Sequence, residues 1–377
     1  MKNLVILTLG FAIARAVGEP APAPTPAPDP RNAVARRADT SCTYSGSAGY
    51  SSASESKAAC STIVLSALTV PAGVTLDLED LNDGTTVVFE GTTTFGYSEW
   101  SGPLFSVSGN DITVRGEAGS ILDGQGALYW DGQGGSGGVT KPKFFKANNL
   151  NDSLLDSITI QNAPKNSFSL NYVYNLTVKD ITVDDKAGEE LGKNTDAFNI
   201  NNADGILITG AKVWNQDDCV AINSGKNIVF ENGFCSGGHG LSIGSVGGQT
   251  NDNAVRNVTF RDSVMENSQQ SVRIKTISGA NGTVDGITYS NIAMSGGDDY
   301  GIIVMQSYNG VDGEPTNGVS VTNFVLQNVT GTVQSDAVNI YIECGVGSCS
   351  DWTWTDVHVT GGKNSTDCQN VPEGISC

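Results

Sequence analysis

A short strand pattern recurs through the second half of the chain, and it constrains the fold more than any other feature. Each copy starts with Gly, Asn or Asp, continues with three residues whose ends are apolar, adds two polar or small residues and ends on an apolar stretch. The copies lie 22 to 33 residues apart and begin at Asn175, Gly205, Asn227, Asn257, Gly286, Gly318 and Asp351. Self-similarity at such an interval is typical of repeat architectures.

The repeats alternate apolar and polar residues with period two and are rich in Val, Ile and Thr. This is the chemistry of β-strands, and the Gly, Asn and Asp between them favour turns with positive φ. The strands follow one another too closely for helices between them, and each unit buries its apolar side only against its neighbours. We therefore predict an all-β solenoid with stacked bends. A β-sandwich of unrelated hairpins is the alternative, and the regular recurrence argues against it. Residues Ser51 to Ala59 are predicted to form a short helix that caps the open end.

A second column of strands precedes these repeats, beginning at Ala197, Cys219, Gly240, Ser271, Gly301 and Ala337. The residues directly before these strands are Asp196, Asp218, His239, Gln270, Tyr300 and Asp336. Neighbouring coils of a parallel solenoid lie about 4.8 Å apart. The alignment therefore predicts that Asp196, Asp218 and His239 form a row on one outer face.

Three further ionisable side chains are predicted to join this row. Asp217 lies one residue before it, and Arg273 and Lys275 alternate with the apolar Val272 and Ile274, so both cations point outward. An acidic trio in a groove suits glycoside hydrolysis, in which one carboxyl protonates the leaving oxygen and another carboxylate activates water or attacks directly. Close carboxylates raise one another's pKa, which keeps a proton on one of them.

The neighbouring cations suit a carboxylated sugar, because Arg can make a paired contact with a carboxylate. Asp217 and Asp218 taken alone would equally fit a pair of calcium ligands or a solvated turn. Adjacent side chains of an extended chain point apart. We therefore expect the Asp217 carboxyl to stand away from Asp196 and Asp218, at the separation of about 6.5–9.5 Å that an inverting glycosidase needs.

Four segments resemble, in order and spacing, the signature motifs of the polygalacturonases, glycoside hydrolase family 28: Asn194-Thr195-Asp196, Gln216-Asp217-Asp218, Gly238-His239-Gly240 and Arg273-Ile274-Lys275. Tyr300-Gly301 resembles the active-site tyrosine of the family, and the resemblance extends over residues 38–377. It implies a right-handed single-stranded parallel β-helix of about ten coils. It also implies cofactor-free, metal-independent and endo-acting hydrolysis of the α-1,4-galacturonosyl linkages of pectin and polygalacturonate.

The resemblance implies a role for each matching residue. Asp217 is the implied general acid, Asp196 and Asp218 the pair that holds and activates water, and His239 the residue that supports protonation of the acid. Galacturonate would be bound by Asn194, Arg273, Lys275 and Tyr300. Ala197 departs from the glycine of many relatives and is expected to change packing only.

Other functions remain open. An exo-polygalacturonase or a xylogalacturonan hydrolase would share most motifs and differ in the loops that close the groove. A pectate lyase shares the fold but eliminates with calcium and a base, and a non-catalytic carbohydrate-binding β-helix need not keep the acidic trio. His239 and the segment Arg273-Ile274-Lys275 argue against rhamnogalacturonan hydrolases, in which these motifs are altered.

The N-terminal region indicates secretion. Lys2, a short apolar run and small residues up to Gly18 predict a signal peptide over residues 1–18. The run is shorter than the roughly 20 residues of a membrane span. Residues 19–37 are rich in Pro and Ala and end at the dibasic pair Arg36-Arg37, which predicts a propeptide and leaves residues 38–377 as the catalytic domain.

All eight cysteines lie in the mature region, where an even number after a signal peptide predicts disulfides. Short spacings favour the pairs Cys42–Cys60, Cys219–Cys235, Cys344–Cys349 and Cys368–Cys377, although spacing alone leaves the connectivity open. Candidate glycosylation sites are Asn151, Asn175, Asn257, Asn281, Asn328 and Asn364.

The charge of the mature chain is strongly negative. Of 21 basic and 40 acidic residues, the first 37 positions hold five and two, which leaves 16 and 38 and a net charge of −22. Nucleic acid is an unsuitable partner for such a chain, and an acidic polysaccharide requires the few cations to gather where it binds. We expect a monomer that binds polygalacturonate and no membrane.

Overall fold

The structure is a computed structural model that describes residues 40–250 and 252–377. They belong to one compact unit that runs from Asp39 to Cys377. The predicted signal peptide and propeptide lie outside the described residues. Among the helices of the described part, none has the length and apolar character to cross a membrane.

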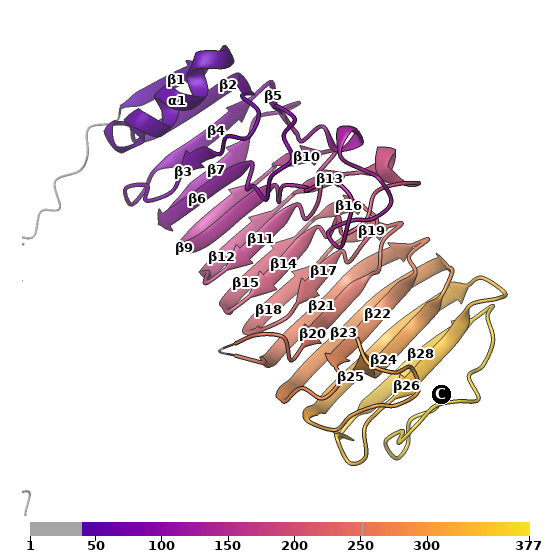
Figure 1. The fold of residues 1–377 in the computed structure, drawn as a ribbon. Helices are drawn as coiled ribbons and strands as arrows, with labels where there is room; N and C mark the ends of the chain where they lie inside the picture. Colours follow the sequence, from indigo (N-terminus) through magenta and orange to yellow (C-terminus); the bar gives the residue numbers. More distant parts are fainter. Residues whose placement is uncertain (1–39, 251) are drawn as a thin grey trace, which may run out of the picture. The chain divides into compact units, whose positions relative to one another are not determined.

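The described chain is a parallel β-helix whose strands stack in three columns (Figure 1). The first column contains the predicted repeats. Its strands are β1 (Ser41–Ser45), β2 (Thr62–Val70), β4 (Thr86–Glu90), β7 (Thr113–Gly116), β9 (Phe145–Asp156), β12 (Tyr174–Lys179), β15 (Ala203–Thr209), β18 (Gly225–Glu231), β21 (Ala254–Glu266), β23 (Gly282–Gly297), β25 (Val319–Val333), β27 (Cys349–Ser350) and β28 (Thr353–Thr360).

The second column follows each of these strands around a bend. It is built from the C-terminal parts of β2, β21, β23, β25 and β28 together with β5 (Thr92–Phe95), β8 (Ile121–Asp123), β10 (Thr159–Gln161), β13 (Thr182–Asp184), β16 (Lys212–Trp214) and β19 (Phe234–Ser236). Two single-turn 3-10 helices lie in the connections after this column, η3 (Gly126–Leu128) and η4 (Lys186–Gly188).

The third column carries the predicted site. In the described residues it stacks the start of β9 with β3 (Leu76–Leu78), β6 (Phe105–Asn110), β11 (Phe168–Asn171), β14 (Phe198–Asn201), β17 (Val220–Ile222), β20 (Leu241–Val246), β22 (Gln270–Ile277), β24 (Tyr300–Tyr308) and β26 (Val338–Glu343). These ten strands confirm the predicted number of coils.

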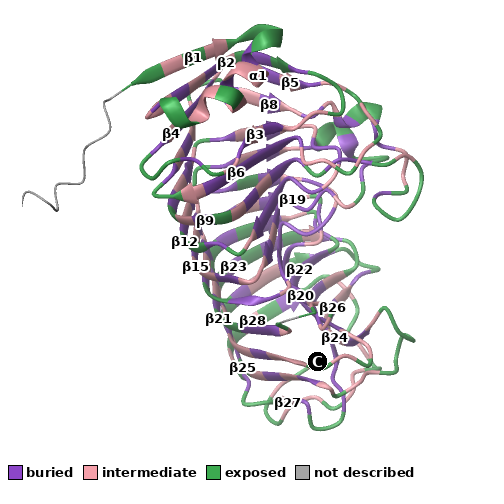
Figure 2. Ribbon diagram, turned by 60° about the vertical axis from the view of Figure 1, so that its left-hand side comes forward, coloured by how far each residue is buried: buried purple, intermediate pink, exposed green. Residues whose placement is uncertain are grey.

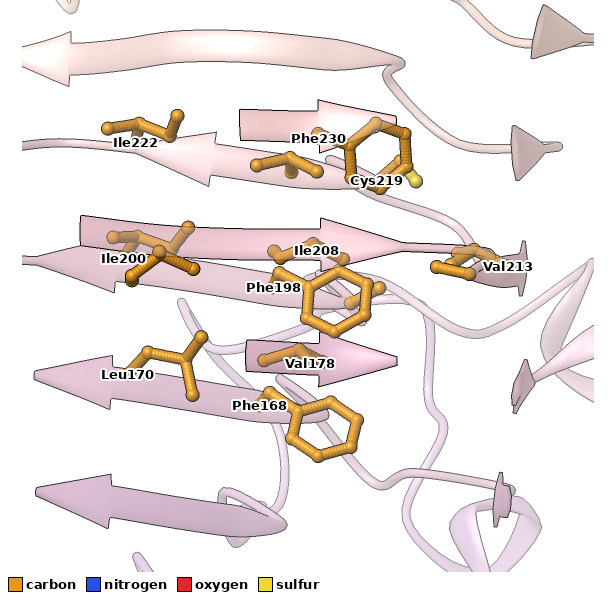
Figure 3. Packing of buried hydrophobic residues seen from close by; sticks show 14 of the residues in the cluster. Phe168, Leu170, Val178, Phe198, Ile200, Ile208, Val213, Cys219, Ile222 and Phe230 are labelled. Atoms are coloured by element: carbon orange, nitrogen blue, oxygen red, sulfur yellow. The ribbon is translucent and has the colours of Figure 1, made fainter. Parts of the chain in front are cut away.

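The core follows from this register, because equivalent residues of successive coils lie directly above one another. Phe145, Phe168 and Phe198 are paired in register, and their ring centroids are 4.9 and 5.3 Å apart. Figure 3 shows this stacking between Phe168 and Phe198, beside a row of Leu170, Ile200 and Ile222. Each coil thus buries its apolar side only against the coils on either side of it.

The bends stack as well. Asn175, Asn227 and Asn257 have φ angles of 53°, 57° and 51°, the left-handed conformation that asparagine tolerates. The Asn257 Nδ2 donates to the Asn227 Oδ1 at 2.6 Å, and the Asn175 Nδ2 donates to the Asp152 Oδ1 at 2.8 Å. Asn175 and Asn257 are candidate glycosylation sites, so the nitrogen that would carry a sugar already joins neighbouring coils. Occupancy of these sites stays a prediction.

A helix covers the N-terminal end of the solenoid, as predicted, but with different bounds. Helix α1 spans Gly46–Ser56 and continues as the 3-10 helix η2 (Lys57–Ala59), whereas the sequence suggested a start at Ser51. It packs on β1, β2 and β3, and its outer surface is exposed (Figure 2). A side chain at Gly49 would meet the Leu68 Cδ2 at 2.6 Å. The early turn therefore uses small residues to approach β2, and their low helix propensity hid its start.

The predicted register is confirmed except at two strands. In the first column Gly318 was expected beside Gly286, but Ile287 pairs with Phe324, so Asn323 takes that place. The two halves of this repeat share one apolar pattern, which cannot distinguish them.

The other exception is the last strand of the third column. Val220 pairs with Phe198 and Leu241, as expected. Tyr300, however, pairs with Val338 and not with Asp336. A shift of two residues leaves the inward and outward faces unchanged, so the apolar pattern cannot detect it.

All eight cysteines form disulfides, and the pairs are those favoured by spacing: Cys42–Cys60, Cys219–Cys235, Cys344–Cys349 and Cys368–Cys377. Cys219 directly follows Asp218, so the second disulfide ties the start of β17 to β19.

Candidate active site

Asp196, Asp218 and His239 form a row at the starts of β14, β17 and β20, as predicted. The Ala197 N–H donates to the Asp218 carbonyl at 3.0 Å, and the Cys219 N–H donates to the Gly240 carbonyl at 2.9 Å. Asp218 therefore lies between the coils of Asp196 and His239.

Asn215 holds the bend that carries both adjacent aspartates. Its Nδ2 donates to the carbonyls of Thr195, Asp217 and Asp218 at 3.0, 2.9 and 3.0 Å. The side chain is buried, so these bonds are made away from water and fix the backbone of the site. Sequence reasoning missed Asn215, although it directly precedes the motif Gln216-Asp217-Asp218.

Each oxygen of the Asp217 carboxyl accepts hydrogen bonds. Oδ1 accepts from the His239 Nδ1 at 2.9 Å and from the Asp218 N–H at 2.8 Å, and Oδ2 accepts from the Asn194 Nδ2 at 2.8 Å. Burial opposes ionisation of Asp217. The hydrogen bond and charge of His239, with the charge of Lys275, nevertheless hold the pKa of Asp217 below its usual range.

Asp218 is almost fully buried and binds the two predicted cations. Its Oδ2 lies 2.7 Å from the Lys275 Nζ, and its Oδ1 lies 3.6 Å from the Arg273 Nη1. The Ser242 Oγ donates to Oδ1 at 2.5 Å. Arg273 and Lys275 thus form ion pairs with Asp218 itself and are not reserved for the substrate. Ser242 is a further contact of Asp218, which the sequence analysis did not predict.

Asp196 differs from its neighbours in its electrostatics. Its Oδ1 accepts a hydrogen bond from the Asn166 Nδ2 at 2.8 Å. Burial, followed by the negative charges of Asp217 and Asp218, raises the pKa of Asp196 well above its usual value. The trio therefore contains one carboxyl that favours its protonated form, and this is Asp196.

The expected wide separation is wrong for Asp217 and Asp218. One oxygen of each carboxyl and a nitrogen of His239 all lie within 4.8 Å of one another. Alternation of side chains holds for an extended strand, but Asp217 lies in a bend, and its Oδ1 turns back to the Asp218 N–H. These atoms are close enough to hold a metal ion, yet Lys275 and Arg273 already provide Asp218 with positive charge.

A groove of about 970 Å³ opens beside this cluster. Asn194, Asp217 and His239 line it, together with Trp214 from β16 and Lys186 from η4, whose Nζ lies 3.9 Å from the centroid of a Trp214 ring. The groove thus combines the carboxyl of Asp217 with an aromatic surface and a cation. Trp214 and Lys186 were not among the predicted site residues.

Tyr300 lies in the same column, where it pairs with Gln270 on β22. Its ring centroid is 5.6 Å from that of Tyr341, and burial raises the pKa of Tyr300. A second tyrosine, Tyr308, lies beside the cations, with its ring centroid 5.3 Å from the Lys275 Nζ. Of the two tyrosines, the sequence analysis named only Tyr300.

Comparison with known proteins gives one consistent result. Residues 60–377 match the family described as Glycosyl hydrolases family 28. The chain is 56% identical over 377 residues to a probable endopolygalacturonase E of Aspergillus niger, covering 100% of this chain and 99% of that protein. It is 53% identical over 378 residues to endopolygalacturonase I of Aspergillus aculeatus, with both chains fully covered.

Among solved structures, endopolygalacturonase I from Stereum purpureum, complexed with two galacturonates, is 36% identical with a TM-score of 0.77, and the match covers 88% of this chain and 99% of that one. An endo-xylogalacturonan hydrolase from Aspergillus tubingensis has the same TM-score at 22% identity, covering 89% and 100%. The second likeness supports the fold alone.

Proposed function

The chain belongs to family 28 of the glycosyl hydrolases, and we propose that it cleaves internal α-1,4-galacturonosyl linkages of polygalacturonate and pectin. Relatives named endopolygalacturonases match its full length. The observation that carries the proposal is the cluster of Asp196, Asp217 and Asp218 with Arg273 and Lys275, because it joins acid–base carboxyls to cations that suit a carboxylated sugar.

Asp217 and His239 together supply the proton for the leaving oxygen in this proposal. Their Nδ1 and Oδ1 lie 2.9 Å apart, so a single hydrogen-bonded proton between them can pass from one to the other. In the free enzyme the electrostatics favour the ionised form of Asp217. A bound galacturonan brings negative carboxylates, which raise the pKa of Asp217 and transfer the shared proton towards it. The proton then passes to the glycosidic oxygen as its bond to the anomeric carbon breaks.

Asp196 and Asp218 hold the attacking water. Their backbones pair on neighbouring coils, so one water can contact both carboxyls. Asp218, in its ion pair with Lys275, accepts the proton of the water as the new bond to the anomeric carbon forms. The nearest oxygens of Asp217 and Asp218 lie within 4.8 Å of each other, so we infer that a bound sugar parts the two carboxyls to the wider gap that an attacking water needs. Attack by water on the face opposite the leaving group then inverts the configuration, and the α-linkage should release a β-configured reducing end.

The raised pKa of Asp196 makes this residue the other candidate for the proton donor, and the leaving group distinguishes the two. Asp217→Asn and Asp196→Asn would be assayed on polygalacturonate and on a galacturonide whose leaving group needs no protonation. Loss of acid–base catalysis costs about 10²–10⁴-fold. We expect Asp217→Asn to lose at least about a hundredfold on polygalacturonate and to recover most of this on the activated substrate.

Asp196→Asn should stay slow on both substrates, since it impairs the water. The reverse pattern would assign the acid to Asp196. Asp204→Asn is the matched control, because Asp204 is a surface carboxylate on β15 paired with Lys226. Proton NMR of the first product tests inversion, and an α-anomer before mutarotation would exclude it.

Product analysis separates the related activities. Endo action yields a mixture of oligomers from the start, whereas an exo-acting enzyme releases a single short product throughout. An unsaturated product that disappears on adding a chelator would indicate a calcium-dependent lyase instead.

We also propose that the protein is secreted and processed at its N-terminus. Residues 1–18 would act as a signal peptide and residues 19–37 as a propeptide, so that a monomeric catalytic domain of residues 38–377 meets its polysaccharide outside the cell. N-terminal sequencing of the secreted protein tests this, with Ala38 as the expected first residue.

A further inference from the structure

A second hollow, of about 400 Å³, lies beside the glycine-rich loop Gly132–Gly138. Its lining includes the three lysines Lys141, Lys143 and Lys165, together with Ser101. Neither the predicted site nor the cleavage chemistry uses these residues. A gathering of lysines is unusual on a chain with a net charge of −19.

The hollow adjoins the groove of the active site. Ser136, in the glycine-rich loop, lines both spaces. The loop is also linked to the catalytic cluster, since the Gly135 N–H donates to the Asn194 Oδ1 at 2.9 Å and the Asn194 Nδ2 binds Asp217. A chain-like ligand in the groove can therefore continue into the hollow along this loop.

The loop is fixed in place by Asp131. Its carboxyl accepts hydrogen bonds from the Gln133 and Val139 N–H groups, both at 3.0 Å, and forms an ion pair with Lys141 at 2.8 Å. The Lys141 side chain is almost fully buried. Lys141 therefore has its counter-charge and supports the wall of the hollow.

Lys143 and Lys165 have no such partner. Within residues 40–250 and 252–377, neither ammonium lies within 4.0 Å of a carboxylate oxygen. Burial lowers the pKa of Lys165, the charges of Lys143 and Lys141 lower it further, and the charge of Asp196 opposes them. The pKa of Lys165 is thus influenced both by the other lysines of the hollow and by a member of the catalytic trio.

The loop sequence is adapted to this arrangement. A Cβ on Gly135 would lie 2.4 Å from the Lys165 Nζ, so the ammonium occupies the space beside the loop backbone that a side chain would take. Lys143 itself is exposed and free to meet a ligand.

We propose that Lys143 and Lys165 bind a carboxylate of the galacturonan chain at a sugar remote from the bond that is cleaved. The inference rests on the proposed function and names a second carboxylate-binding position in addition to Arg273 and Lys275. The ligand class is a polyanionic sugar chain, because the two unpaired ammonium groups line a hollow that shares Ser136 with the groove beside Asp217. Such contacts position the chain and do not touch the reacting atoms.

The test compares Lys143→Ala with Lys226→Ala over galacturonate oligomers of increasing length. Lys226 is the matched control, since it is a surface lysine in an ion pair with Asp204 on a different column of strands. We expect kcat/KM of Lys143→Ala to fall about fivefold on long oligomers, through KM, and less than about twofold on the shortest oligomer that is cleaved. Lys226→Ala should match the wild type at every length.

Two further measurements complete the test. Lys143→Arg should retain most of the binding, because it keeps the charge, and the deficit of Lys143→Ala should shrink at high salt. An equal loss at all lengths, or no loss, would overturn the inference. If the proposed function itself were wrong, the wild type would fail to cleave any of the oligomers, which is a different result.

Discussion

The two neighbouring carboxyls of Asp196 and Asp217 should affect stability in opposite directions when each is replaced by Asn. The folded-state pKa of Asp196 is raised by burial and by Asp217 and Asp218. The folded protein then binds a proton more tightly than the unfolded chain, so stability falls as pH rises from the unfolded pKa towards the folded one. Asp196→Asn removes this penalty, and the free energy of unfolding at pH 7 should rise.

The shifted pKa of Asp217 has the opposite effect on folding stability. Its folded-state pKa lies below the usual range, so its stabilisation is fully present above the unfolded pKa of about 3.9 and is lost as pH falls through the folded value. Asp217→Asn should therefore lower the free energy of unfolding at pH 7. The replacement gives up charge-assisted hydrogen bonds from His239 and Asn194, at a cost of about 1.5–3 kcal/mol.

The gain from Asp196→Asn follows from the same relation. Because the pKa of Asp196 is raised well above its usual value, we expect the gain at pH 7 to exceed the change of about 0.5 kcal/mol or less that a surface substitution causes. An amide oxygen in place of Oδ1 can still accept the hydrogen bond from Asn166. The substitution therefore keeps the buried Asn166 donor paired.

Denaturant unfolding followed by tryptophan fluorescence, at pH 4 and pH 7, measures both effects. The difference for Asp196→Asn should shrink strongly at pH 4, where the unfolded carboxyl is about half protonated. The difference for Asp217→Asn should be mostly retained at pH 4, because the folded-state pKa of Asp217 lies lower still. Asp204→Asn serves as the control for a surface carboxylate. If both variants were destabilised at pH 7, or if neither difference changed with pH, the electrostatic description of the cluster would be refuted.

Three other results are expected. Lys275→Ala leaves the buried Asp218 with only its longer contact to Arg273 and should cost about 3 kcal/mol in denaturant unfolding; a loss as small as that of Lys226→Ala would contradict this. Gly240→Ala places a Cβ 2.1 Å from the Gln270 carbonyl at a φ of 73°, and a thermal scan should show a drop of several degrees. A normal melting temperature would show that the backbone relaxes freely there. Methyl esterification of the substrate should reduce kcat/KM more for the wild type than for Lys275→Ala, and equal sensitivity would show that this lysine does not read the sugar carboxylate.

The register of the solenoid was predictable because each strand has a distinct inner and outer face. Asp196, Asp218 and His239 follow from the repeat alone, since a one-residue slip would turn them into the apolar interior and turn Val220 and Leu241 outward. A slip of two residues does not change the faces, and for this reason the alignment misplaced Asp336.

The detail of the site was less predictable, because it depends on bends and not on strands. Alternation of side chains predicted that the carboxyls of Asp217 and Asp218 point apart. In the structure the Asp217 carboxyl instead accepts a hydrogen bond from the Asp218 N–H, which holds it beside Asp218. Nothing in the pattern of strands marks Asn215, whose single amide holds three carbonyls from two coils. The lysines of the second hollow come from connections whose paths no periodicity describes.

Helix α1 also closes the N-terminal end of the solenoid, so that no further coil can stack there. In the described chain, β1 pairs with β2 on one side, and an open strand edge is a template on which another chain can add. The apolar interior would be equally accessible at this end, but α1 covers it and the Cys42–Cys60 disulfide joins β1 to the residue that follows η2. Stacked coils could in principle continue to add at an uncovered end, as they do in a fibre. The cap at the N-terminal end prevents this. Reduction of this one disulfide should therefore promote end-to-end association of the molecules before it affects the catalytic coils.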